Sequence, residues 1–205
     1  MGEERSPIAL MPPVRIVWHA GSVGVLAEPQ AVALPPVWRL FLLGDGSTTR
    51  SLSLLTGERI CVDVIEMRDA EDDASGPDDL DLIAAPRVRR CVWLCTERGT
   101  RLGYATSWWT ARHAHNYLTD AALPIGVNLD RLHCAPHRDI RLVFLAHSPC
   151  LEAAFGHAGP FWARDYLMRE RDEVLCLIRE VFSPILEGPL GPTSPPYCEG
   201  LDRVG

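Results

Sequence analysis

The stretch Val174-Leu175-Cys176-Leu177-Ile178-Arg179-Glu180-Val181-Phe182, near the carboxyl end of the chain, is the clearest predictor of the fold. It is largely apolar, partly β-branched and followed by Ser183-Pro184, which predicts a β-strand. Side chains alternate between the two faces of a strand, so one face carries Val174, Cys176, Ile178, Glu180 and Phe182. An ionised carboxylate in a dry apolar row costs on the order of several kcal/mol unless it is paired or protonated. Glu180 therefore has a partner, a ligand or a shifted pKa, unless the end of the strand is wet.

A second strand repeats this pattern with the opposite charge. Residues 87–95 predict a strand, 96–100 a turn and 102–109 the returning strand of a hairpin. Arg90 shares one strand face with Val88, Val92 and Leu94. Its planar guanidinium remains charged and suits a carboxylate. Two interpretations stay open: a structural ion pair between Arg90 and Glu180, or two groups that line one cavity.

Shorter signals place the other elements. A helix is expected from an N-cap at Asp45 or Ser47 to about residue 55, and its start offers free N–H groups either to an anion or simply to the cap. Further strands are expected at 59–66, 139–146 and 161–168, and helices at 111–118 and 149–155. Residues 37–43 fit a helical turn or a strand, and 123–126 fit a turn. His113 and His115 are expected at the surface. The acidic stretch 68–86 predicts a long surface loop, a kind of segment that is often a lid or disordered.

These elements predict an α+β fold with a largely antiparallel sheet flanked by short helices. At least five strands are joined by turns or short helices, and few gaps are long enough for βαβ crossovers. We expect a proline-rich arm over 1–35, one domain over 36–188 and a loose tail over 189–205.

Composition narrows the function classes. The net charge of −7 and the acidic cluster at 69–81 argue against a nucleic-acid surface, but not against a small anionic ligand. The seven cysteines are odd in number and lack a C-x-x-C pair, which favours reduced core thiols over disulfides or zinc. No apolar run is long enough for a stable membrane insertion, and the acidic N-terminus lacks a signal-peptide core, so a cytoplasmic protein is expected. No P-loop, nucleophile elbow, zinc or dinucleotide motif occurs, so we expect chemistry without metal or cofactor.

An ordered set of motifs over roughly 36–188 resembles the chorismate pyruvate-lyase family, most closely its cyanobacterial and plastid-type branch. The set comprises Gly44-Asp45-Gly46-Ser47-Thr48-Thr49-Arg50 followed by Leu54-Leu55-Thr56-Gly57, Arg89-Arg90-Cys91-Val92-Trp93-Leu94, Leu102-Gly103-Tyr104-Ala105-Thr106-Ser107-Trp108-Trp109, Leu123-Pro124-Ile125-Gly126, Arg138-Asp139-Ile140, His147-Ser148 with Leu151-Glu152, Gly159-Pro160-Phe161-Trp162 and Glu180-Val181-Phe182-Ser183-Pro184. The family's Trp-Gly-Arg appears here as Trp162-Ala163-Arg164, which lies outside the contacts that the resemblance implies.

The resemblance implies the reaction and the site. The family converts chorismate to 4-hydroxybenzoate and pyruvate without a cofactor, in an internal cavity under flaps. Arg90 matches its carboxylate-binding arginine, and Glu180 matches the acidic residue that faces the product's hydroxyl. Ser47 and Ile125 match positions whose backbone N–H groups hold the ligand. A lyase for quinone or plastoquinone synthesis follows, acting as a monomer on the small molecule alone.

The role of Glu180 and two other functions remain open. Glu180 could act near the breaking ether bond as a general acid, a proton relay or a positioning group. A non-catalytic binding protein for an aromatic carboxylate would use the same cavity. A scaffold protein would instead use the acidic loop 69–81 and leave Arg90 and Glu180 as a structural pair.

Overall fold

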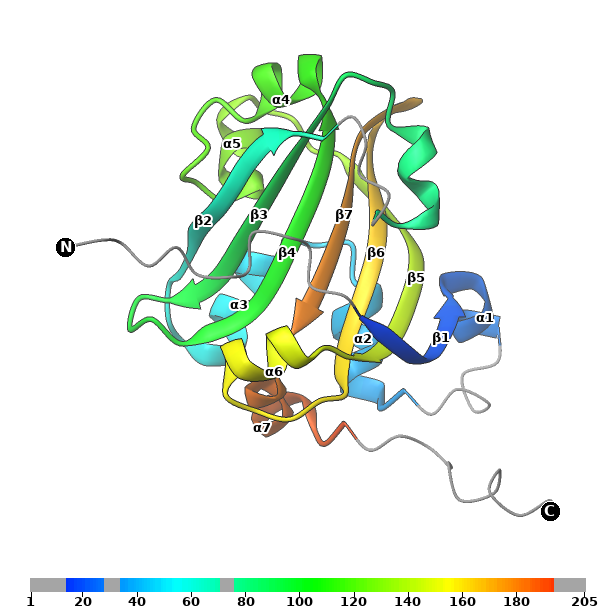
Figure 1. The fold of residues 1–205 in the computed structure, drawn as a ribbon, viewed down its shortest axis with the longest axis vertical. Coiled ribbons are helices and arrows are strands. Elements are labelled where there is room, and N and C mark those ends of the chain that lie inside the picture. The colour runs from blue at the N-terminus through cyan, green and yellow to red at the C-terminus, as the bar shows by residue number, and fades with distance from the viewer. Residues whose placement is uncertain (1–13, 28–33, 71–75, 194–205) are drawn as a thin grey trace.

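The structure is a computed structural model that describes residues 14–27, 34–70 and 76–193. A seven-stranded sheet forms its centre, in the order β1-β5-β6-β7-β4-β3-β2, and every neighbouring pair is antiparallel (Figure 1). The strands are β1 (Arg15–Gly21), β2 (Ile60–Asp69), β3 (Arg87–Thr96), β4 (Arg101–Thr110), β5 (His137–His147), β6 (Phe161–Glu170) and β7 (Glu173–Phe182). The predicted α+β class with a largely antiparallel sheet is confirmed.

The helices are short. They are α1 (Ser22–Ala27), α2 (Pro36–Leu43), α3 (Thr48–Thr56), α4 (Ala111–Tyr117), α5 (Ile125–Arg131), α6 (Pro149–Phe155) and α7 (Glu187–Leu190), with the 3₁₀ turns η1 (Asp78–Leu82) and η2 (Pro184–Leu186). Ser47 caps α3 as predicted, and Gly57 ends it with a φ of 69°. Residues 37–43, for which the sequence did not decide between a helical turn and a strand, belong to α2, which begins at Pro36 after the N-cap Pro35.

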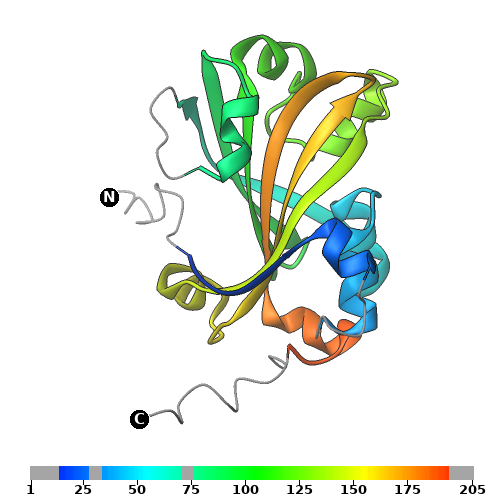
Figure 2. The ribbon, with the colours of Figure 1, turned by 90° about the vertical axis from the view of Figure 1, so that its right-hand side faces the viewer.

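The alternation of side chains divides the core between the two sheet faces. On one face Trp38 and Leu42 of α2 pack with apolar residues such as Trp162 and Phe182 of the sheet. On the other face Leu151 and Phe155 of α6 pack with sheet residues such as Trp93. Figure 2 shows the sheet between these layers, with α2 on one side and α6 on the other. The proposed site lies on the face that carries α2.

The stretch 68–86 departs from the predicted surface loop. Strand β2 continues to Asp69, and residues 71–75 lie outside the described residues. Leu80 and Ile83 are buried against Trp108 and Leu167, on the sheet face opposite to Glu180. The described part of this stretch therefore covers the second face of the sheet and does not cover the pocket described below.

One further expectation is wrong. His113 is 3% exposed, so its assignment to the surface is wrong: its ring nitrogens lie 3.2 Å from the Leu175 carbonyl and 2.9 Å from a Glu173 oxygen. Within the predicted arm, β1 adds an edge strand beside β5, and residues 1–13 lie outside the described residues. An edge strand can only be assigned once its partner is known, and β5 follows more than a hundred residues later.

The six described cysteines are all free, although Cys61 and Cys150 are exposed rather than buried in the core. Cys198 lies outside the described residues. None of the described helices is both long and apolar enough to cross a bilayer.

Candidate active site

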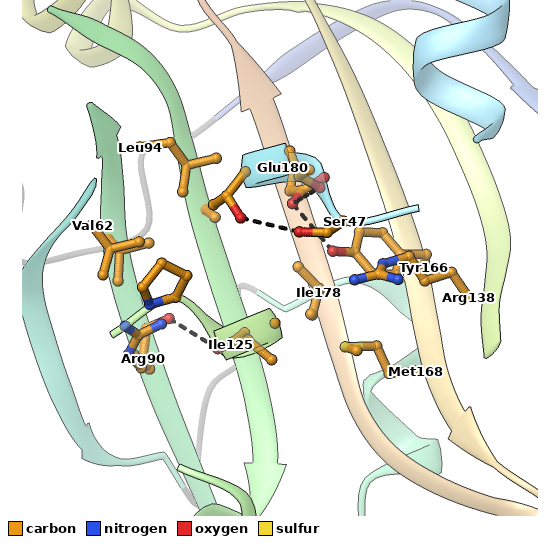
Figure 3. Close-up of a pocket in the computed structure, with 17 residues that line it drawn as sticks. Ser47, Val62, Arg90, Leu94, Ile125, Arg138, Tyr166, Met168, Ile178 and Glu180 are labelled. Carbon is orange, nitrogen blue, oxygen red and sulfur yellow. Dashed lines mark hydrogen bonds between the residues drawn. The ribbon is translucent and has the colours of Figure 1, made fainter. Parts of the chain in front are cut away.

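A pocket lies between the α2-bearing face of the sheet and the first turns of α3 and α5 (Figure 3). All four residues that the sequence marked as site residues line it: Ser47, Arg90, Ile125 and Glu180. The remaining wall is mostly apolar and includes Val62, Val92, Leu94, Ala105, Ile178 and Met168. The structure thus brings together residues that are separated by up to 133 positions in the sequence.

Glu180 is held by three donors. Nε of Arg164 donates to Oε2 at 2.8 Å, while Oγ1 of Thr48 and the hydroxyl of Tyr166 donate to Oε1 at 2.8 and 3.1 Å. Both members of the Arg164–Glu180 pair are nearly inaccessible to solvent. Burial and the neighbouring carboxylate raise the pKa of Tyr166, so its hydroxyl stays protonated and able to donate. This environment matches an ionised carboxylate, which only accepts hydrogen bonds.

Strand register explains why Arg164 reaches Glu180. The two residues are direct partners in the β6–β7 ladder, so their side chains project side by side from the same face. The other nitrogens of Arg164 donate to Thr48 and to three carbonyl oxygens in and just after α2. Arg164 therefore ties the α2–α3 connection to the sheet face that carries Glu180.

The predicted alternative of an Arg90–Glu180 ion pair is wrong. Arg90 donates from Nε and Nη2 to the Ala121 carbonyl at 3.2 and 2.8 Å, and from Nη2 to the Leu123 carbonyl at 3.0 Å. Among the described residues, no carboxylate pairs with it. Burial lowers the pKa of Arg90 to about 10, which leaves it positively charged at neutral pH. A buried cation without a counter-charge is costly, and an anionic ligand would offset that cost.

Two helix starts cover the pocket. Ser47 is the N-cap of α3, and Ile125 is the first residue of α5 after Pro124, where the sequence predicted only a turn. The first N–H groups of a helix lack partners within the helix and attract anions. A Cβ atom placed on Gly126 would lie 3.3 Å from Oγ of Ser47, so the two helix starts nearly touch. This contact narrows the pocket on its outer side.

A wider groove lies outside that contact. Ser47, Thr49, Pro124 and Gly126 line both the pocket and the groove. The free space inside the pocket is about 50 Å³, and a water needs about 10–15 Å³ on this scale, so the pocket has room for roughly four waters.

Sequence reasoning missed four polar residues of the site: Thr48, Arg164 and Tyr166, which hold Glu180, and Arg138, which lines the pocket. A signal for two of them was present, because Trp162, Arg164, Tyr166 and Met168 share one strand face, and Arg164 is the charged exception. The arrangement as a whole offers a cation, an apolar slot and a carboxylate in line. Such a site suits a planar ring that carries an acid at one end and a hydroxyl at the other. Within the described ranges, no cluster of His, Cys, Asp and Glu residues could hold a metal ion.

Comparisons with known proteins give a family and a fold. The sequence model of the family described as "Chorismate pyruvate-lyase Rv2949c-like" matches residues 42–190. The uncharacterized protein ycf21 of Cyanophora paradoxa is 32% identical over 173 residues, which are 84% of this chain and 90% of that protein. The ycf21 protein of Porphyra purpurea is 30% identical over 155 residues, which are 76% of this chain and 85% of that protein.

Among solved structures, PhnF from Mycobacterium smegmatis is similar with a TM-score of 0.53 at 15% identity, over 77% of this chain and 71% of that one. At this identity the similarity shows a shared fold alone.

Proposed function

Since this chain belongs to the Rv2949c-like chorismate pyruvate-lyase family, we propose that it converts chorismate to 4-hydroxybenzoate and pyruvate. In this elimination the C3–O ether bond breaks and a proton leaves C4, so that the ring becomes aromatic. The leaving group is enolpyruvate, which takes up a proton at its methylene carbon and becomes pyruvate. No electrons enter or leave, so the reaction needs no redox partner.

The observation that supports the proposal is that Arg90 and Glu180 line one largely apolar pocket at separate positions. Each has hydrogen-bonding capacity left for a ligand. No hydrogen bond from Nη1 of Arg90 to a described residue is present. A carboxylate offers about four acceptor positions, and three donors occupy Glu180. Arg90 can thus bind the ring carboxylate while Glu180 accepts the hydrogen at the opposite end of the ring.

Each group has a distinct task in this proposal. Arg90 fixes the ring carboxylate and with it the orientation of C3 and C4. Glu180, ionised beside Arg164, accepts the C4 proton or the hydrogen bond of the C4 hydroxyl as the ring becomes aromatic. Because all three of its protein partners donate hydrogen bonds to it, Glu180 suits a base or a positioning group better than a general acid. The apolar walls exclude water and hold the ring flat.

The reaction itself is the test. Purified protein is incubated with chorismate, and 4-hydroxybenzoate and pyruvate are measured separately. We expect the two products in a 1:1 ratio, at a rate that EDTA does not change. Absence of turnover would refute the proposed lyase activity, and tight binding of 4-hydroxybenzoate in that case would favour a non-catalytic binding protein.

Replacing Arg90 with methionine should weaken binding of 4-hydroxybenzoate by about 10- to 100-fold, because a hydrogen-bonded charge pair is lost. Methionine retains much of the apolar stem, so the pocket wall is preserved. Isothermal titration calorimetry measures the effect, with Arg98→Met in the exposed hairpin turn as the matched control. Unchanged affinity in the Arg90 variant would remove the carboxylate clamp from the account.

We also propose that the product supplies quinone synthesis, including plastoquinone where it occurs, in the cytoplasm and with the chain as a monomer. The resemblance supports this use, and the pocket is built from one chain. Disruption of the gene should lower quinone content, and added 4-hydroxybenzoate should restore it. If added 4-hydroxybenzoate fails to restore the quinone content although the purified protein is active, the product has another use.

A further inference from the structure

A second arginine lines the same pocket and has no role in binding the product as proposed above. Arg138 of β5 donates from Nη1 to the Asp45 carbonyl at 2.8 Å, and its guanidinium lies 6.0 Å from the centre of the Tyr166 ring. Its Nε is buried and has no hydrogen-bond partner among the described residues. The neighbouring Asp139 pairs with Arg141 and Arg169 instead. Arg138 thus presents unused donors to the pocket without a counter-charge.

The sheet fixes where this charge lies relative to the other two polar groups. In the order β5-β6-β7-β4-β3, Glu180 of β7 is in the middle, with Arg90 two strands to one side and Arg138 two strands to the other. Strands are about 4.8 Å apart, so each arginine starts about 10 Å from the Glu180 strand. Figure 3 shows Arg90 and Arg138 on opposite sides of the pocket. Along the strands Glu180 lies further than either, because Arg138 is level with Cys176 and Arg90 with Ile178.

The number of charged positions exceeds what the product needs. 4-Hydroxybenzoate has one carboxylate and one hydroxyl, which Arg90 and Glu180 satisfy. Chorismate has a second carboxylate on the enolpyruvyl group at C3, next to the hydroxyl-bearing C4. C3 is meta to the ring carboxylate, so with that carboxylate on Arg90 and C4 at Glu180 the side chain leaves the ring obliquely and can reach the side of Glu180 away from Arg90. This is the side on which Arg138 lies.

We infer that Arg138 forms a second anion subsite, which binds the enolpyruvyl carboxylate of the substrate and is left empty by the aromatic product. The inference rests on the proposed function. It gives the site a means to bind the dianionic substrate in preference to the monoanionic product. It also links substrate binding to the cover of the pocket, because the same guanidinium holds the carbonyl of Asp45, two residues before the N-cap of α3.

The experiment compares two ligands in two backgrounds. Calorimetry measures chorismate and 4-hydroxybenzoate binding to Glu180→Gln, in which turnover is slow, and to Glu180→Gln/Arg138→Met. We expect chorismate affinity to fall about 10- to 100-fold and 4-hydroxybenzoate affinity to stay within twofold. Arg141→Met, on the same strand but outside the pocket, is the matched control, and circular dichroism verifies folding.

Each outcome decides the inference separately from the proposed lyase activity. An equal loss of both affinities, or no loss of either, would overturn the subsite. Absence of chorismate binding in the unsubstituted protein would overturn it as well. If Arg138→Met selectively weakens chorismate binding but the unsubstituted protein shows no turnover, the subsite is supported and the lyase activity is refuted.

Discussion

Replacing Glu180 with glutamine should lower kcat for chorismate by about 10²- to 10⁴-fold, the usual contribution of a positioned proton-transfer group. Glutamine keeps the size of the side chain and one carbonyl oxygen, but it cannot take up a proton at neutral pH. Binding of 4-hydroxybenzoate should weaken far less than kcat falls, because Arg90 still binds the ligand carboxylate. The variant separates chemistry from binding, and steady-state kinetics with product calorimetry measures both.

The exposed Glu97→Gln variant, in the hairpin turn, is the control for this experiment. Its kinetics should equal those of the unsubstituted protein. An unchanged kcat in Glu180→Gln would eliminate the proton role and leave Glu180 as a structural partner of Arg164.

Replacing Arg164 with methionine should destabilise the protein by about 3–5 kcal/mol, because it leaves the Glu180 carboxylate buried without a charge partner. The variant also removes the hydrogen bonds of Arg164 to the α2–α3 connection. Urea denaturation followed by circular dichroism gives the change in the free energy of unfolding. This would be the largest stability effect of any single substitution in the site.

A double variant tests the cause of that effect. Arg164→Met combined with Glu180→Gln removes the uncompensated charge, so part of the lost stability should return. If the double variant is instead as unstable as the sum of the two single variants, the ion pair contributes no coupling. Arg169→Met, whose partly exposed side chain pairs with Asp139 of the neighbouring strand β5, should cost far less.

The sequence alone could predict which side chains share a strand face, because side chains alternate between the two faces with a fixed period of two residues. Alternation alone placed Arg90 and Glu180 on apolar faces, and both line the pocket. The same rule applied to β6 would have marked Arg164 as a third such residue. What alternation cannot give is the register between strands, and the direct pairing of Arg164 with Glu180 depends on it. This is why the sequence left an Arg90–Glu180 ion pair open as one interpretation and did not indicate Arg164 as the partner.

Tertiary contacts decided the other differences. Leu80 and Ile83 form a short buried segment within an acidic stretch, and the three aspartates at positions 78, 79 and 81 hide that signal. His113 is buried because Glu173 and the backbone of β7 satisfy its ring, and neither partner is near it in sequence. Arg138 stands beside Asp139, which suggests a local pair, but the aspartate faces Arg141 and Arg169 instead. In each case a distant partner outweighs the local pattern.

A crystal structure of the protein with bound 4-hydroxybenzoate tests the central claim, that Arg90 and Glu180 are the two ends of one ligand site. We predict the ligand carboxylate on the Arg90 guanidinium and its hydroxyl on the Glu180 carboxylate, with Arg138 making no contact to it. A ligand bound in the reverse orientation, or in the outer groove between α3 and α5, would contradict the account.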